Sequence, residues 1–299
     1  MRYILQIYQV GSNTFFGRGL VEKAVDLLRG IPDEKDDTEI DVWLQTNGGS
    51  ADAAYHLGHI LRGYASTLRI VVPSWAKSAG TLFCLSADEL YMDRLGELGP
   101  LDAQVQHPLH EEHQVSALDI AESIEQLAQV AISVVISAGA DVIKYTGITR
   151  SVTLSYMLDF ASKFIGPISS KIDPHLLHAA IRVQRASVRY AIKLMYESKI
   201  CSKKPNIPGV AELLANHYPT HSFVIDADEA RNLGLNVRDM STYDLKEEVA
   251  AFHLDNRDND GTFLELVNSN EIAKDEKPKI DEKPGGDQHE EKPKKKSTN

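Results

Sequence analysis

Cysteine is scarce in this chain, which has only Cys84 and Cys201 among 299 residues. Two thiols in apolar surroundings cannot form the disulfide framework of a secreted scaffold, so we expect buried thiols in a reducing compartment. Basic residues are outnumbered, with 32 Lys and Arg against 43 Asp and Glu, which gives a net charge of −11. This balance argues against nonspecific binding to nucleic acid or anionic lipid, because both require a basic surface.

Uninterrupted apolar runs are short. The most hydrophobic one, residues 130–136, is far below the roughly 20 residues that a membrane helix needs. Residues 1–8 alternate polar and apolar side chains, which predicts a strand and not a signal peptide. Glycine fingerprints for phosphates or dinucleotides are missing as well. We therefore expect a cytoplasmic protein that contacts no membrane and carries no nucleotide cofactor.

The rest of the composition is that of a globular protein, with 42% hydrophobic residues. Up to about residue 106, β-rich runs such as 40–46 and 68–72 alternate with helical stretches, which predicts an α/β layer with parallel strands. Helical spacing then dominates over residues 107–217, which we interpret as a helical arm within one domain spanning 1–250. The long helix from Ser116 is too apolar for solvent, so we expect a homo-oligomer.

The end of the chain differs in composition. Residues 271–299 hold eight acidic residues, eight lysines, three prolines and no aromatic side chain. Such a segment cannot bury enough apolar surface to offset the entropy of ordering it, so a disordered charged tail is predicted. Docking of a partner protein is its candidate role.

Two short motifs carry the chemistry. Residues 46–49, Thr-Asn-Gly-Gly, follow a predicted strand, and paired glycines let backbone amides approach a ligand closely. Residues 77–81, Lys-Ser-Ala-Gly-Thr, place Ser78 at the start of a helix, where unpaired amides favour negative charge. A serine hydroxyl beside such amides supplies what acyl transfer requires, a nucleophile with an oxyanion hole. Each motif alone is equally compatible with a simple turn or helix cap.

Together with Leu-Gly-Pro-Leu-Asp at residues 98–102, these motifs resemble the serine dehydrogenase proteinase family in order and spacing. The similarity extends more loosely over residues 40–237. That family resembles Clp-type and signal-peptide-peptidase-type serine proteases, so the resemblance implies a crotonase-like α/β fold with a repeated β-β-α core. It also implies a serine endopeptidase that acts on peptides or proteins, and we expect neither cofactor nor metal.

The resemblance also implies roles for individual residues. Ser78 matches the nucleophile of the family. The backbone amide of Ala79, with that of Gly48 or Gly49, matches the oxyanion hole.

The general base is less clearly matched. Clp-type proteases carry a histidine downstream of the serine and an aspartate later, and here the two types look exchanged, as Asp102 and His221. Because a triad is defined by geometry and not by chain order, we predict that His221 is the base and that Asp102 orients it. Signal-peptide-peptidase relatives use a lysine instead, and a desolvated Lys144, Lys163 or Lys171 is the alternative base.

Two rival functions stay open. One is an enzyme of the same fold that transfers an acyl group or acts on a thioester, because crotonase-type oxyanion holes need no serine. The other is a catalytically silent oligomeric scaffold. A His-x-x-His-x-x-His run at His107, His110 and His113 has unsuitable spacing for metal binding on one helix, so we expect a solvated acidic loop there.

Overall fold

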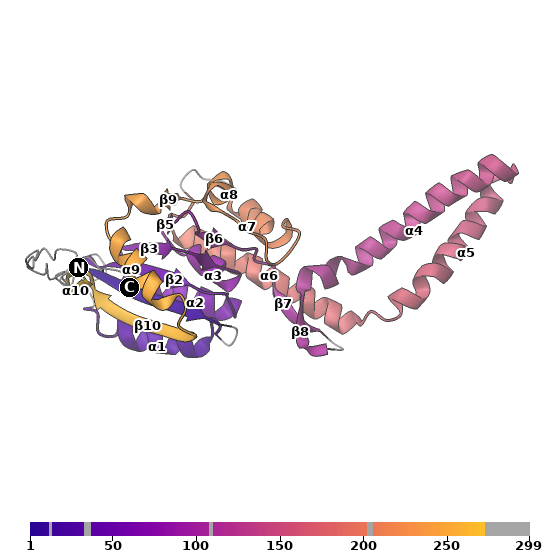
Figure 1. The fold of residues 1–299 in the computed structure, drawn as a ribbon. Coiled ribbons are helices and arrows are strands. Elements are labelled where there is room, and N and C mark those ends of the chain that lie inside the picture. Colours follow the sequence, from indigo (N-terminus) through magenta and orange to yellow (C-terminus); the bar gives the residue numbers. More distant parts are fainter. Residues whose placement is uncertain (12–13, 33–36, 108–109, 202–205, 273–299) are drawn as a thin grey trace, which may run out of the picture.

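The computed structural model describes residues 1–11, 14–32, 37–107, 110–201 and 206–272, and of residues 107 and 110–114 it describes the backbone only. A mostly parallel sheet with helices on both faces forms the body of the molecule, and a pair of long helices projects from it (Figure 1). The α/β class predicted from the sequence is confirmed.

The central sheet has six strands in the order β10-β1-β2-β3-β5-β9. These strands are β1 (Arg2–Val10), β2 (Glu39–Gln45), β3 (Thr67–Val72), β5 (Glu89–Met92), β9 (Val237–Asp239) and β10 (Gly261–Asn268). Only β10 runs antiparallel to its neighbour, β1. A second, two-stranded sheet joins β4 (Trp75–Ala76) to β6 (Glu97–Leu98) in parallel. Each of β3 and β5 is therefore followed by a short strand of the second sheet, which is the repeated β-β arrangement that the family resemblance implies.

The two faces of the sheet are covered by different helices. Helices α1 (Arg18–Leu28), α2 (Ala51–Tyr64), α3 (Ala79–Cys84) and the C-terminal part of α6 (Pro174–Glu197) contribute to the larger core. The smaller core on the other face includes Trp43 and Val249, the latter from α9 (Lys246–Asn256). Because side chains alternate along a strand, Leu5 and Ile7 enter the larger core whereas Ile4 enters the smaller one.

The projecting arm consists of α4 (Ala117–Thr146) and α5 (Arg150–Ser169), rooted by a hairpin of β7 (Gln104–His107) and β8 (His110–Ser116) (Figure 1). This hairpin stands where we expected a solvated loop around His107, because the two strands pair antiparallel. The side chains of residues 107–114, including His110 and His113, lie outside the described part. The arm is shorter than residues 107–217, because the later part of α6 and α7 (Ile207–Asn216) pack into the core.

Helix α4 corrects the argument that we based on the short run at 130–136. Among the described residues it is the helix that is long and apolar enough to cross a membrane, by length and composition alone. An 18-residue window within it is only 6% buried. The sequence argument failed because it counted only uninterrupted apolar residues, whereas the average hydropathy of α4 stays high despite the polar residues within it.

The folded domain also extends past the expected boundary at residue 250. Strand β10 pairs with β1 over eight residues, from Tyr3 with Asn268 to Val10 with Gly261. Helix α8 (Ala227–Asn232), a short 3-10 helix (Met240–Thr242) and α10 (Ser269–Ile272) complete the described chain. The predicted disordered tail at 271–299 lies almost wholly outside the described residues and stays a prediction.

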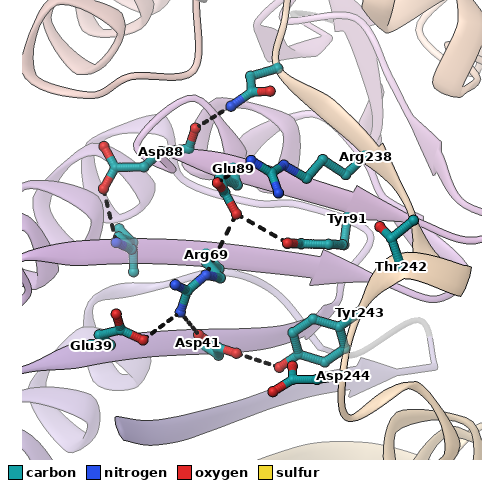
Figure 2. A network of polar contacts seen from close by, with 12 residues as sticks. Glu39, Asp41, Arg69, Asp88, Glu89, Tyr91, Arg238, Thr242, Tyr243 and Asp244 are labelled. Carbon is teal, nitrogen blue, oxygen red and sulfur yellow. Dashed lines mark hydrogen bonds and ion pairs between the residues drawn. The ribbon is translucent and has the colours of Figure 1, made fainter. Parts of the chain in front are cut away.

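A network of polar and charged side chains holds the segment at residues 238–244 against the sheet (Figure 2). The buried carboxylate of Asp41 on β2 accepts hydrogen bonds from Arg2 and Tyr243. Arg69 on β3 donates to Glu39 at 2.8 Å and to Asp41 at 3.3 Å. Every arginine of this network has a carboxylate partner, so we interpret it as structural.

Candidate active site

Ser78 occupies an unusual turn between β4 and α3. Its backbone angles are φ 48° and ψ −113°, and it is the only described residue other than glycine with positive φ. Such a conformation costs of order 1–3 kcal/mol and persists only where the surroundings enforce it. The side chain does not cap α3, although Ser78 holds the capping position. The Ser78 hydroxyl is therefore not used to cap the N-terminus of α3.

The Gly-Gly turn packs directly against this serine. Gly48 has φ 102° and Gly49 has φ 148°, values that side chains disfavour. A Cβ added to Gly48 would lie 2.7 Å from the carbonyl oxygen of Lys77, and one added to Gly49 would lie 2.5 Å from the amide nitrogen of Phe16. Both positions therefore require glycine, as close approach of the backbone predicts.

The structure separates the two candidate amides of this turn. The amide of Gly48 already donates to Thr46 Oγ1 at 3.0 Å. The amides of Gly49 and Ala79 have no acceptor among the described residues, and both residues line the same cavity as Ser78. Of the pair that the sequence left open, Gly49 is therefore the member available for an oxyanion.

Thr81 explains why the Ser-Ala-Gly-Thr and Leu-Gly-Pro motifs occur together. Its buried hydroxyl donates to the carbonyl of Ala76 at 2.7 Å and accepts from the amide of Gly99 at 2.9 Å. One side chain thus fastens the segment before Ser78 to the segment that leads to Asp102.

The structure brings His221 and Asp102 together. Their backbones approach because Leu98 and Ile225 exchange two hydrogen bonds, of 2.9 and 3.1 Å. His221 Nδ1 lies 2.8 Å from Asp102 Oδ1, across 119 positions of sequence. Among the described residues, Ile225 pairs with Leu98 as an isolated antiparallel bridge and belongs to no longer strand.

Asp102 is held in its charged form by the groups around it. Burial alone would raise the pKa of its carboxyl group, but hydrogen bonds from His221 and Ser116, with the charge of His221, leave the pKa below its ordinary value. Gln104 Nε2 donates to Asp102 Oδ2 at 3.0 Å. Ser116 also caps α4 by accepting the amide of Leu118, so the root of the arm contacts this carboxylate.

A cavity of about 730 Å³ collects these groups. Ser78, His221, Gly49 and Ala79 all line it. Within the described residues no hydrogen bond joins Ser78 to His221, although both residues line the same cavity. When Nδ1 of His221 donates to Asp102, its other nitrogen, Nε2, is the one left to accept a proton.

The alternative lysine bases lie elsewhere. Lys144 stacks its ammonium 5.2 Å from the Tyr145 ring, and Lys163 pairs with Asp159 at 2.7 Å. These residues and the exposed Lys171 belong to the arm and its end, and none of them lines the cavity. In a single copy of the chain the structure therefore does not bring the lysine candidates to Ser78.

Lys77, next to the nucleophile candidate in sequence, also points away from the cavity. Its ammonium lies 3.2 Å from Glu97 and donates to the carbonyl of Leu98 at 3.1 Å. The Lys77 ammonium is therefore bound to β6 of the second sheet.

One wall of the cavity was not predicted from the sequence. Helix α6 presents Arg182, Ala186 and Tyr190 to it, and the Tyr190 hydroxyl donates to Asp52 at 2.6 Å. The hydrogen bond to Asp52, with burial, raises the pKa of Tyr190 to about 12. The regular spacing of four residues was a usable signal, but nothing in the sequence said which face of α6 meets the serine.

The two thiols take no part in this site. Cys84 is buried, and burial raises the pKa of its thiol well above the ordinary value. Cys201 is half-buried, and its pKa is raised for the same reason. Both are free, as expected, while the reducing, cytoplasmic location stays a prediction.

An uncapped serine on a strained turn, two free amides and a histidine-carboxylate pair around one cavity define a serine-centred site on an α/β core. Residues 9–139 match the family model of the ClpP-like SDH-type serine proteinases. The resemblance to the serine dehydrogenase proteinase family is thus confirmed over this part of the chain, which includes Ser78 and Asp102 but not His221.

Two curated relatives are uncharacterized proteins of Methanocaldococcus jannaschii. One is 37% identical over 89 residues, which is 29% of this chain and 31% of the relative. The other is 32% identical over 113 residues, which is 36% of this chain and 39% of the relative. The chain spans about a third of the length of the curated relatives that it matches.

Two solved structures are similar at low sequence identity. Both are forms of the 1510-N membrane-bound stomatin-specific protease. A serine-to-alanine mutant is 13% identical, with 75% of this chain and 74% of that chain covered and a TM-score of 0.42. A lysine-to-alanine mutant in complex with a substrate peptide is 14% identical, with 73% and 66% covered and a TM-score of 0.39.

Proposed function

We propose that this chain is a serine peptidase in which Ser78 is the nucleophile. The observation that carries the proposal is the strained, uncapped conformation of Ser78 in a cavity that it shares with His221. A residue that neither caps its helix nor adopts a relaxed backbone pays a conformational cost, and nucleophiles on sharp turns before helices share this geometry.

The reaction follows from the positions of the groups. A peptide carbonyl enters the cavity and His221 Nε2 accepts the proton of Ser78 as Oγ attacks the carbonyl carbon. The amides of Gly49 and Ala79 stabilise the negative oxygen of the tetrahedral intermediate. The protonated imidazole then gives its proton to the leaving amine, and water hydrolyses the acyl-enzyme by the same route.

Asp102 acts through His221. Its carboxylate, held charged by its surroundings, fixes the tautomer that leaves Nε2 free and stabilises the imidazolium that forms. A hydrogen bond between Ser78 and His221 must form for proton transfer, and catalytic hydrogen bonds commonly tighten when substrate binds.

The nucleophile is tested with a fluorophosphonate probe on the full chain. We expect Ser78→Ala to abolish labelling, while the control Ser137→Ala, on the exposed arm, labels like the parent. Circular dichroism must be unchanged in both variants. Labelling that survives Ser78→Ala would refute the assignment.

The same material separates the rival functions. A thioester enzyme of this fold should gain melting temperature with coenzyme A, which a peptidase should ignore. If the protein is a catalytically silent scaffold, the parent should neither be labelled by the probe nor cleave peptides.

We also propose that the arm assembles with a second copy of this chain. Its helices expose large apolar side chains on α4 and α5, among them Ile132, Ile136, Leu158 and Phe164. Leaving such a surface in water is unfavourable, so a partner surface is required. Docking of other partners through the C-terminal tail stays a prediction.

A bilayer suits this arm less well than another copy does. Gly139 on α4 packs against Met157 on α5, so the ion pair of Asp159 and Lys163 lies alongside the apolar part of α4. If α4 crossed a bilayer, this ion pair would lie inside the apolar layer, where charged side chains are costly. A helix of a second copy would leave the pair at a solvent-exposed rim.

A further inference from the structure

We infer that the candidate active-site cavity contains a carboxylate-binding subsite at Arg182, so that its substrates carry an acidic group. This inference rests on the proposed peptidase function and names its substrate class. The carboxylate is either an acidic side chain of the peptide or its free C-terminus, since both present the same group to a guanidinium.

Arg182 is the only lysine or arginine among the described residues that line the cavity. Within the part of the chain that the structure describes, Arg182 has no ion pair or hydrogen bond from its side chain, whereas the arginines of the sheet network all have carboxylate partners. Its planar guanidinium suits bidentate binding of a carboxylate. Asp52 on α2 also lines the cavity, where it accepts a hydrogen bond from the Tyr190 hydroxyl at 2.6 Å and forms no ion pair with Arg182 among the described contacts.

The geometry of α6 gives the subsite a direction. Arg182, Ala186 and Tyr190 follow one another at intervals of four residues, so they lie on one face of the helix. Ala186 and Ser187 are small and leave room between the two ends of this wall. With a rise of 1.5 Å per residue, Arg182 and Tyr190 are about 12 Å apart along the axis, which an extended peptide spans in about four residues.

The net charge of the chain is negative, so the positive charge of Arg182 at the cavity stands out against it. At −11 the protein repels anionic substrates at long range, so binding of an acidic peptide requires a specific cationic contact. Arg182 is exposed, and it has no ion pair with another described residue that a ligand would first have to displace. The cavity is therefore polarised, with the arginine at one end of the α6 wall and the Tyr190–Asp52 pair at the other.

The test measures binding and cleavage with paired peptides. Each pair differs only in Glu against Gln at one position, and a second series compares C-terminal acids with amides. Fluorescence anisotropy with the Ser78→Ala chain reports binding without turnover, and kcat/KM of the parent reports cleavage. We expect about a tenfold or larger preference for one acidic form, because hydrogen bonds to charged groups discriminate by that amount.

Substitutions then assign the preference. Arg182→Gln should remove it, and Arg182→Glu should reverse it in favour of Lys-containing peptides. The control Arg185→Gln lies on the same helix, is exposed and does not line the cavity, so it should keep the preference. Unchanged melting temperatures establish that the variants fold.

The outcomes of this test are distinct. Equal binding of all acidic and neutral forms, or a preference that survives Arg182→Gln, would overturn the subsite. Loss of fluorophosphonate labelling or of cleavage altogether would instead bear on the peptidase proposal, because the anisotropy measurement needs no catalysis.

Discussion

At the scale of single residues, the candidate site depends on a few atoms whose neighbours leave them no alternative. Ser78 is held at positive φ, Gly49 cannot carry a side chain, and Asp102 is surrounded by donors. Two of these constraints involve segments distant in sequence, since Phe16 leaves no room for a side chain at Gly49 and His221 is a partner of Asp102. The positions of the reacting groups therefore depend on the packing of the residues around them.

Asp102 allows a prediction about catalysis and stability together. Asp102→Asn should lower kcat by about 10²–10⁴, because an amide cannot stabilise the imidazolium or enforce the same tautomer. The folded-state pKa of Asp102 lies below its unfolded value, so its charged form stabilises the fold above about pH 4, the ordinary range of aspartate. This contribution is lost as the pH falls through the lowered pKa.

Urea unfolding of the parent and of Asp102→Asn between pH 3 and pH 7 measures the effect. The difference in free energy of unfolding should be largest near neutral pH and shrink toward acid. Asp255→Asn, at an exposed position on α9, is the control and should show no such trend. A difference that is constant with pH would contradict the assigned role.

At the scale of elements, the C-terminal strand is as much a part of the domain as the first one. Strand β10 covers the edge of β1, and Phe263 on it meets Phe252 of α9 with ring centres 5.3 Å apart. The charged network of Figure 2 holds the segment just before α9 onto the same face. An edge strand that is hydrogen-bonded over eight residues is not a detachable appendage.

A truncation tests this view. Ending the chain after residue 260 should lower the melting temperature by about 10 °C or more, because four half-buried apolar residues of β10 contribute roughly 1 kcal/mol each. Ending it after residue 272 should leave the melting temperature unchanged. Equal stability of the two truncated chains would show that β10 is not an essential part of the folded domain.

At the scale of the whole molecule, the arm and the site share their structural supports. Helix α6 extends from the groove between the arm helices, where Leu177 lies, to the cavity wall at Arg182. The root of the arm reaches Asp102 through Ser116, and Gln184 of α6 accepts the amide of Ala103 at 2.8 Å. Assembly through the arm would thus act on the elements that hold the catalytic candidates.

The assembly is tested by disrupting the arm's apolar surface. We expect the parent to sediment as a dimer or larger oligomer at micromolar concentration, and Ile136→Glu to shift it toward the monomer. Ser137→Glu adds the same charge one position along α4, on a different side of the helix, and should have a smaller effect. A parent that is already monomeric, or one that floats with liposomes, would contradict the proposed occupant of the arm.

The sequence by itself determined the local features: the alternation of strands and helices, the long helix after Ser116, and the glycines beside Ser78. Periodicity and motif chemistry act over a few residues, so they can be read directly from the chain. It also ranked His221 and Asp102 as partners, but only through resemblance.

The tertiary structure alone decided what depends on contacts between distant segments. It showed that the amide of Gly48 already donates to the hydroxyl of Thr46, and that α6 brings Arg182 to the cavity. It also showed that the hydrogen bonds between Leu98 and Ile225 bring the segments of Asp102 and His221 together. It also placed β10 at the edge of the sheet beside β1, because strand pairing joins residues far apart in sequence. No local pattern encodes which strands or helix faces meet, since that choice is made by the packing of the whole domain.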